Sequence, residues 1–163
     1  MKYLLHGFLC VSVLLGAGCI STTDVGVDSQ QETTTPSVSG SKLDLSNQGL
    51  TQVSQDVFKQ TELLELDLSG NALTGALPAE IRFLSQLEVL DASDNNMTGV
   101  PAEVGQLKRL KILDLSNNQL TGLPLELGQL TQLETLDLRG NAYSTSDLQQ
   151  IRKTLTITTI LVD

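Results

Sequence analysis

A short pattern of apolar and polar positions recurs five times along the chain. In each copy a polar residue lies between two apolar positions, and a further polar stretch leads to an Asn or Gln and then to another apolar residue. The copies are GSKLDLSNQGL (40–50), LLELDLSGNAL (63–73), LEVLDASDNNM (87–97), LKILDLSNNQL (110–120) and LETLDLRGNAY (133–143). Successive side chains of a strand point to opposite faces, so each copy predicts a short strand with its apolar side chains inward.

The segments between these copies also repeat. They read LPAEIRFLSQL (77–87), VPAEVGQLKRL (100–110) and LPLELGQLTQL (123–133), with apolar residues three positions apart. This spacing predicts short helical or 3₁₀ turns that return the chain to the start of the next strand. The strands should then stack in parallel about 4.8 Å apart. The central leucines of the copies are 23, 24, 23 and 23 residues apart. The second repeat is one residue longer than the others, with the extra residue near Gly75, after its copy of the pattern.

The end of the chain predicts a cap for this stack. Ser146-Asp147-Leu148-Gln149 has the pattern of a capping box. A helix should follow over residues 147–154 and bury Leu148, Ile151 and Leu155. Residues 157–162 then repeat the apolar spacing of the earlier copies, with Ile157 in the first position. We interpret them as a sixth, final strand.

Four Asn residues occupy one position of the pattern, and their amides should satisfy backbone groups that the following turn leaves unpaired. They are Asn71, Asn95, Asn118 and Asn141, with Gln48 in the first copy. Together with the leucines, this motif resembles the leucine-rich repeat family over residues 42–163. The resemblance implies an α/β solenoid of about five repeats of 23–24 residues, with a curved parallel β-sheet on the concave face and short helical or 3₁₀ turns on the convex face. It also implies a non-catalytic scaffold that binds other proteins.

The N-terminus predicts export and lipidation. Residues 1–18 combine a basic start, a short apolar run and small residues at its end, as secretory signals do. The junction Leu15-Gly16-Ala17-Gly18-Cys19 resembles a bacterial lipobox, although Leu15 lies one position earlier than in its commonest form. The resemblance makes Cys19 the lipidated residue of the mature chain. The alternative is an ordinary signal peptide with an incidental Cys.

The segment that follows predicts a spacer. Ten of the 22 residues from Ile20 to Ser41 are Ser or Thr, and none is aromatic. Such a segment buries too little apolar area to offset its ordering entropy. We therefore interpret residues 19–41 as the lipidated Cys with a disordered tether, and residues 42–163 as the repeat domain with a C-terminal helix–strand cap.

Charge and composition exclude several classes of function. The net charge of −9 argues against nucleic acid, since a phosphate backbone requires a basic surface. After Cys19 the chain has no His and no Cys, which excludes catalysis by His or thiol groups, zinc sites and disulfides there. We expect no catalytic residues, cofactor or metal. We interpret the basic cluster of Lys108, Arg109 and Lys111 as a solvated outer surface.

The residues between inward-pointing apolar positions should face solvent on the concave sheet. The candidate partner-binding residues there are Glu65, Asp67, Val89, Asp91, Ile112, Asp114, Thr135 and Asp137. Two interpretations of the acidic column remain open. It is either a docking groove for a basic partner with Val89 and Ile112 as apolar anchors, or generic repeat sequence in which Asp and Ser bond locally.

These features predict a monomeric interaction module on a bacterial envelope, held by its lipid anchor alone and extracytoplasmic, at the outer membrane if the cell has two. Its partner would be a protein of unknown identity. The alternative is a structural or adhesion component that recognises glycan or matrix. The scarcity of aromatic residues, 3% of the chain, weighs against that alternative because sugar sites favour aromatic platforms.

Overall fold

The computed structural model describes residues 42–163. The predicted signal peptide (1–18) and tether (19–41), including Cys19, lie outside the described residues.

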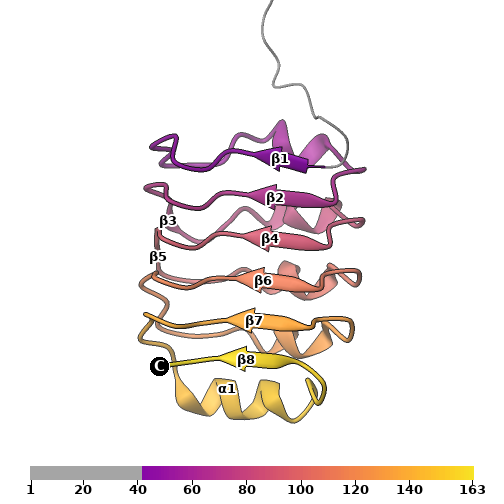
Figure 1. Cartoon of the computed structure of the whole chain (residues 1–163), viewed down its shortest axis with the longest axis vertical. Coiled ribbons are helices and arrows are strands. Elements are labelled where there is room, and N and C mark those ends of the chain that lie inside the picture. Colours follow the sequence, from indigo (N-terminus) through magenta and orange to yellow (C-terminus); the bar gives the residue numbers. More distant parts are fainter. Residues whose placement is uncertain (1–41) are drawn as a thin grey trace, which may run out of the picture. The chain divides into compact units, whose positions relative to one another are not determined.

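Six strands form one parallel sheet, in which strands that are consecutive along the repeats lie next to each other (Figure 1). They are β1 (Lys42–Asp44), β2 (Glu65–Asp67), β4 (Val89–Asp91), β6 (Ile112–Asp114), β7 (Thr135–Asp137) and β8 (Thr159–Leu161). The central residues pair from strand to strand as Leu43, Leu66, Leu90, Leu113, Leu136 and Ile160. The predicted strands and their register are therefore confirmed, including the sixth strand.

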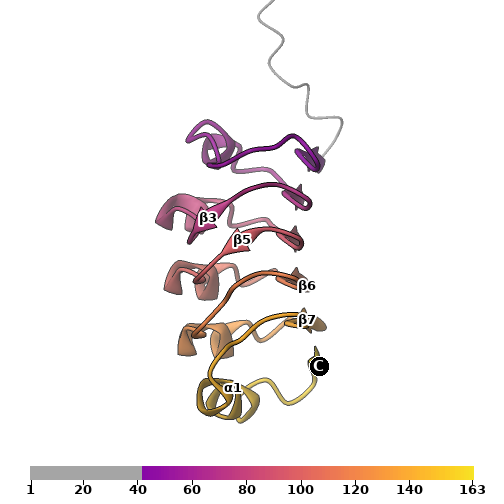
Figure 2. The same ribbon diagram turned by 90° about the vertical axis from the view of Figure 1, so that its left-hand side faces the viewer.

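Short helical turns lie on the flank opposite the sheet (Figure 2). They are the 3₁₀ helices η1 (Val57–Lys59), η2 (Ala79–Phe83), η3 (Ala102–Gln106) and η4 (Leu125–Gln129), followed by the helix α1 (Thr145–Arg152). Pro78, Pro101 and Pro124 directly precede η2, η3 and η4. Proline suits this place because its φ is preset and the N–H it lacks has no partner in the first turn. The predicted leucine-rich-repeat solenoid is confirmed.

The core is a continuous aliphatic column between the sheet and the 3₁₀ helices. In the third and fourth repeats, Leu87, Leu90, Leu107, Leu110 and Leu113 are all at most 1% exposed. Each buried Leu contributes about 1.5–3 kcal/mol relative to an exposed one. Phe58 is the only aromatic side chain of the described part that belongs to the buried core, where it fills the first repeat. The low aromatic content of the chain is thus matched by a core built from stacked leucines.

The Asn residues form the predicted ladder, and each one joins two repeats. The side-chain Nδ2 of Asn118 donates to the carbonyl oxygens of Ala92 (2.9 Å) and Leu115 (3.1 Å), and its Oδ1 accepts the backbone N–H of Met97 (2.9 Å). Asn95 makes the equivalent bonds one repeat earlier, to Leu68 and Leu73. Buried backbone groups left unpaired are costly, so these amides stabilise the turns that follow each strand.

A column of residues with left-handed backbone conformation, that is with positive φ, lies beside this ladder. Asn47, Asp94 and Asn117 have φ between 52° and 55°, and Gly70 and Gly140 have φ of 64° and 68°. Glycine is favoured at the last two, because it adopts this φ without strain and a Cβ there would require the side chain of Asn47 or Asn117 to move, with Oδ1 at 2.3 and 2.5 Å. The turn position therefore accepts only glycine or the residue types that tolerate this conformation.

A second small sheet was not predicted from the sequence. Strand β3 (Thr74–Gly75) pairs in parallel with β5 (Asn96–Met97) on the segment that leaves the main sheet. The extra residue of the second repeat lies here, and Gly75 has a φ of 71°. A two-residue pairing of this kind has no recognisable alternation in the sequence.

The structure corrects two details at the C-terminus. Helix α1 begins at Thr145 with Ser144 as N-cap and no side-chain capping bond, so the predicted capping box at Ser146 is wrong. The carboxylate of Asp147 instead accepts the backbone N–H of Leu123 (3.3 Å), which fixes the first turn to the preceding repeat. The predicted burial of Leu148, Ile151 and Leu155 is confirmed. Ile157, expected inward, is largely exposed, whereas Leu155, two residues earlier, belongs to the core.

Candidate binding face

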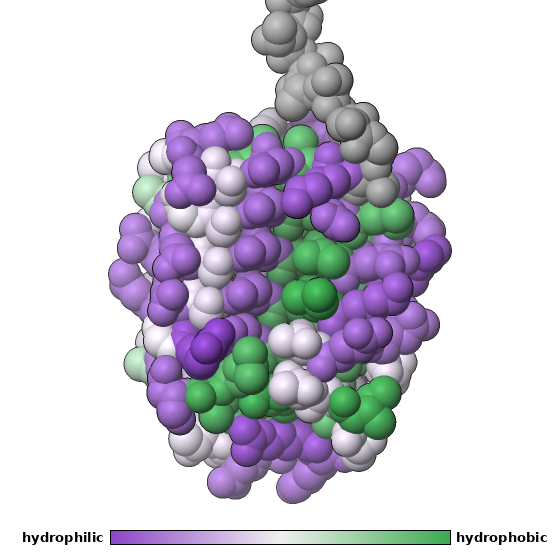
Figure 3. All heavy atoms as spheres, in the orientation of Figure 1, coloured by the Kyte–Doolittle hydropathy of each residue, from purple (hydrophilic) through white to green (hydrophobic). Residues whose placement is uncertain are grey.

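The eight candidate residues lie on four neighbouring strands of the concave face. Two columns cross the strands there. The mixed column consists of Lys42, Glu65, Val89, Ile112, Thr135 and Thr159, and the acidic column consists of Asp44, Asp67, Asp91, Asp114 and Asp137. Figure 3 shows apolar atoms in the middle of this face with hydrophilic atoms beside them. The structure therefore brings the predicted residues together on one face of the sheet, but the expectation that Asp137 faces solvent is wrong, since its side chain is buried beneath Arg139.

Each Asp of the acidic column except the last makes the same local bonds. In Asp91, one oxygen, Oδ1, accepts both the backbone N–H (3.0 Å) and the hydroxyl (2.6 Å) of Ser93. The pairs Asp44–Ser46, Asp67–Ser69 and Asp114–Ser116 repeat this arrangement. Such bonds agree with the interpretation of the acidic column as generic repeat sequence, in which Asp and Ser bond locally. These bonds also fix the orientation of each carboxylate.

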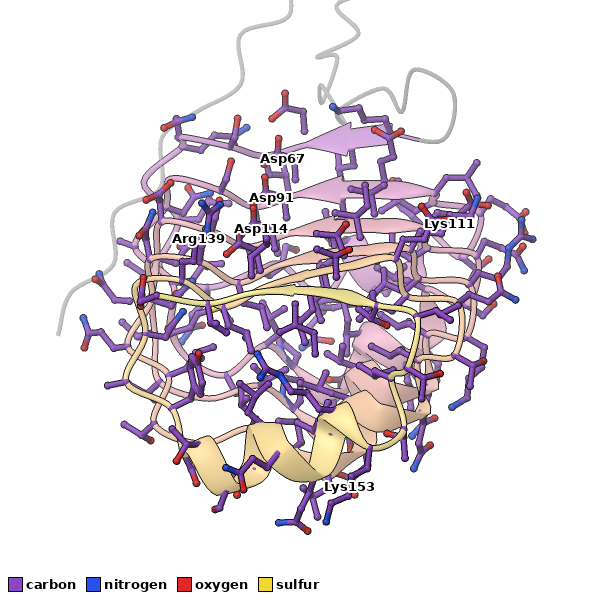
Figure 4. All side chains as sticks on the ribbon, turned by 60° about the horizontal axis from the view of Figure 1, so that its bottom comes forward. Asp67, Asp91, Lys111, Asp114, Arg139 and Lys153 are labelled. Carbon is purple, nitrogen blue, oxygen red and sulfur yellow. The ribbon has the colours of Figure 1, made fainter. Side chains whose placement is uncertain are left out.

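The second oxygen of these carboxylates is left for solvent or a ligand. For Asp67, Asp91 and Asp114, no hydrogen bond to Oδ2 occurs among residues 42–163. Figure 4 shows these three side chains one beside the next on successive strands, with Arg139 next to them. The face thus presents a row of fixed carboxylates, each with one oxygen occupied.

Asp137 differs because an arginine replaces the serine two residues later. Its two oxygens accept the Nε–H of Arg139 at 3.0 and 3.1 Å, and Nη2 donates to Oδ2 as well. Asp137 is only 3% exposed. The hydrogen bonds from Arg139 lower the pKa of the Asp137 carboxyl below its ordinary value, although burial opposes the shift. This pair was not predicted from the sequence, where its signal was Arg139 in a column that is otherwise serine.

The side chains of the mixed column are charged on the first two strands, aliphatic on the next two and polar after that. Lys42 and Glu65 form an ion pair with 3.6 Å between Nζ and Oε2 at the first two strands. Val89 and Ile112 follow, and Ile112 is 41% exposed, while Thr135 continues on β7. An aliphatic pair therefore interrupts the polar side chains of the mixed column, next to Asp91 and Asp114.

The basic cluster beside the fourth repeat is held by local partners. Lys111 and Arg109 both bind the carboxylate of Glu88, at 2.6 and 2.9 Å. The two cations lower the pKa of Glu88, with the hydrogen bond from Lys111 as the larger cause. The Nζ of Lys108 donates to the carbonyl oxygen of Gly105 at 2.6 Å. Lys111 lies away from the acidic column in Figure 4, and both Lys111 and Arg109 are paired with Glu88 rather than with that column.

The described residues offer no metal centre or membrane-spanning helix. Between Lys42 and Asp163, no group of three or more His, Cys, Asp or Glu residues is arranged to hold a metal ion. The acidic column spreads its oxygens along a line, whereas Ca²⁺ requires six to eight that converge. Within the same range, every helix is too short or too polar to cross a membrane.

Comparison with known proteins agrees with this geometry. A family model described as a leucine-rich repeat region matches residues 42–160. No curated protein matches the chain. Among solved structures, a leucine-rich repeat protein of Leptospira interrogans is 43% identical, with a TM-score of 0.68, and the match covers 72% of this chain and 30% of that one.

Two receptor kinases of Arabidopsis thaliana are also similar. The leucine-rich-repeat ectodomain of SOBIR1 is 34% identical with a TM-score of 0.60, and the match covers 74% of this chain and 66% of that chain. HAESA, solved in complex with the peptide hormone IDA and the co-receptor SERK1, is 33% identical with a TM-score of 0.63 over 74% of this chain and 21% of that chain. The chain thus spans less than two thirds of the length of these relatives. By its repeats, its fold and the family model, this chain belongs to the leucine-rich repeat family.

Proposed function

We propose that this chain is a non-catalytic protein-interaction module that binds a protein partner through its concave face. The observation that carries the proposal is the aliphatic pair of half-buried Val89 and exposed Ile112, in the middle of a sheet whose other outward side chains from β1 to β7 are polar. Apolar area surrounded by polar residues is typical of interaction surfaces. The HAESA relative, solved with a peptide hormone and a co-receptor, supports the same role.

We further propose that the module works outside the cytoplasm, tethered to a bacterial envelope by a lipid on Cys19. The lipobox-like junction at Cys19 and the similarity to a Leptospira protein support this location. Changing Cys19 to Ser should then release the protein from the membrane fraction of an expressing bacterium. Retention of that variant in the membrane fraction would argue against the lipid anchor.

The interaction role is tested by capture of partners with the full chain. Detergent-solubilised protein is compared with the double variant Val89→Asp and Ile112→Asp, and captured proteins are identified by mass spectrometry. The matched control is the double variant Phe83→Asp and Leu125→Asp, since these exposed apolar residues (48% and 50%) belong to η2 and η4 on the opposite flank. A partner lost only with the first variant supports the proposal. A partner lost equally with both variants, or with neither, contradicts binding through the concave face.

Recognition of glycan or matrix is the weaker candidate. Of the aromatic residues in the described part, Phe58 is buried, Tyr143 is half-buried and Phe83 is on the convex flank. Neither column of the concave face therefore contains an aromatic ring on which a sugar could stack.

A further inference from the structure

We propose that the concave face binds an extended, positively charged segment of the partner, in which cationic and aliphatic side chains alternate. This inference rests on the proposed function and specifies its ligand. The cationic side chains would lie on Asp67, Asp91 and Asp114, and the aliphatic ones on Val89 and Ile112.

The alternation follows from how the two columns are placed. On each strand, the residue of the mixed column and the residue of the acidic column are two positions apart, as Val89 and Asp91 are on β4. They therefore project from the same face about 7 Å from each other. An extended segment that crosses the strands between the columns turns successive side chains alternately to the two sides. One side would meet Val89 and Ile112, and the other would meet the acidic column.

The length of the segment follows from the strand spacing. Asp67, Asp91 and Asp114 lie on the adjacent strands β2, β4 and β6. The outer two are thus about 10 Å apart, which is two strand spacings. Same-side residues of an extended chain repeat about every 7 Å. Two or three long cationic side chains in a segment of five to seven residues would span the three carboxylates.

The chain itself contains an example of a cation on this column. Arg139 occupies the serine position of the fifth repeat, and its guanidinium contacts both oxygens of Asp137. In the three preceding repeats the serine takes only Oδ1, and Oδ2 remains accessible to a donor from another molecule. A partner arginine or lysine would supply the donor that Arg139 supplies within the chain. Charge-assisted hydrogen bonds of this kind are stronger than neutral ones.

The charges of the face also determine where along the sheet the cationic part of the segment would lie. Arg139 neutralises the acidic column at β7, and Leu161 takes the position of the Asp on β8. At the other end, Lys42 lies close to both Asp44 and Glu65. The carboxylates of the acidic column that make no ion pair within residues 42–163 and lie away from Lys42 are therefore Asp67, Asp91 and Asp114, and the last of these is still attracted by Arg139. The cationic part of the segment would lie there, with any neutral continuation over β7 and β8.

A direct test measures the binding of a peptide of this pattern to the full chain in neutral detergent. The probe is fluorescent Gly-Arg-Val-Arg-Val-Arg-Gly, and its binding is followed by fluorescence anisotropy. The control peptide has Gln in place of each Arg. The protein variants are the triple Asp67→Asn, Asp91→Asn and Asp114→Asn, which keeps an acceptor for each serine. The matched control is Glu80→Gln, Glu103→Gln and Glu126→Gln, which removes the same charge from equivalent positions of the convex 3₁₀ helices.

We expect the concave triple variant to bind the peptide about tenfold more weakly, since each partly exposed ion pair contributes a few-fold. The convex variant should bind within about twofold of the unchanged protein, because its substitutions lie on the far flank. The Gln peptide should bind the unchanged protein as weakly as the Arg peptide binds the concave variant. Salt should weaken binding of the Arg peptide through screening.

Three results would overturn the inference: no binding of the Arg peptide, equal losses with the two triple variants, or equal binding of the two peptides. If the concave triple variant fails to fold, Asp91→Asn is compared with Glu103→Gln, and equal affinities again contradict the inference. Failure here is distinguishable from failure of the proposed function. A partner that is lost with the Val89 and Ile112 substitutions but retained by the Asp→Asn triple variant supports the module and excludes this ligand.

Discussion

Removal of one amide from the Asn ladder tests how the solenoid is held together. In an Asn118→Ala variant, the N–H of Met97 loses its acceptor at 2.9 Å. The carbonyl oxygen of Ala92 loses its 2.9 Å bond and keeps only a longer bond of 3.3 Å from Asn95. The carbonyl oxygens of Leu115 and Ser116 keep other donors, namely Asn141 and the N–H of Asp94. The cost is therefore set mainly by one unpaired donor and one weakened acceptor.

A buried polar group left unsatisfied costs about 1–3 kcal/mol, so we expect the variant to lose about 2–4 kcal/mol of unfolding free energy. The assay is urea unfolding at neutral pH followed by circular dichroism. With a slope of about 1–3 kcal/mol per molar urea, the midpoint should fall by about 1–3 M. Such a loss is a large part of the total stability of an ordinary domain.

The control is Gln119→Ala at the adjacent position. Its exposed side chain makes one long bond of 3.3 Å to Asn96, so its loss should stay within about 0.5 kcal/mol. If Asn118→Ala were no more destabilising than Gln119→Ala, the ladder would not hold the repeats together, and our reasoning about the turns would be refuted.

The remaining predictions concern packing and charge. Leu113→Ala should lower the unfolding free energy by about 2–5 kcal/mol, because Leu113 is fully buried and its loss leaves a cavity; an unchanged melting midpoint would contradict the core assignment. Gly105→Ala should destabilise by about 1–3 kcal/mol in urea unfolding, since its Cβ would lie 2.3 Å from the carbonyl oxygen of Glu126. The control Gly99→Ala should be nearly neutral in the same assay, because the nearest atom to its Cβ would be 3.9 Å away. Because Arg139 lowers the folded-state pKa of Asp137, this carboxylate adds stability that is fully present above the ordinary value of 3.8 and is lost as the pH falls through the lowered value. Asp137→Asn should therefore destabilise the protein at pH 7 but much less at pH 2, and an equal loss at both values in urea titrations would contradict the ion pair.

The sequence alone determined the fold, the strand register and the members of the candidate face. Each of these depends on local alternation, repeated at nearly constant spacing. Leu90 and Leu113 pair across strands because they hold the same place in their repeats. For the same reason Asp91 and Asp114 had to be neighbours on one column. When repeats stack, residues at equivalent positions of the sequence pattern become neighbours in space, so the pattern predicts contacts between distant parts of the chain.

The tertiary structure decided features that depend on particular contacts between neighbouring repeats. Asp147 binds the N–H of Leu123, 24 residues away, and helix α1 starts earlier than its capping pattern indicated. Glu88 holds Lys111, 23 residues away, and Arg139 occupies both oxygens of Asp137. The pattern specifies which residues meet, but side-chain length and the angle of approach decide which atoms bond. Those quantities exist only once the repeats have stacked. This is why one acidic column contains both a carboxylate neutralised by Arg139 and three whose Oδ2 accepts no hydrogen bond from residues 42–163.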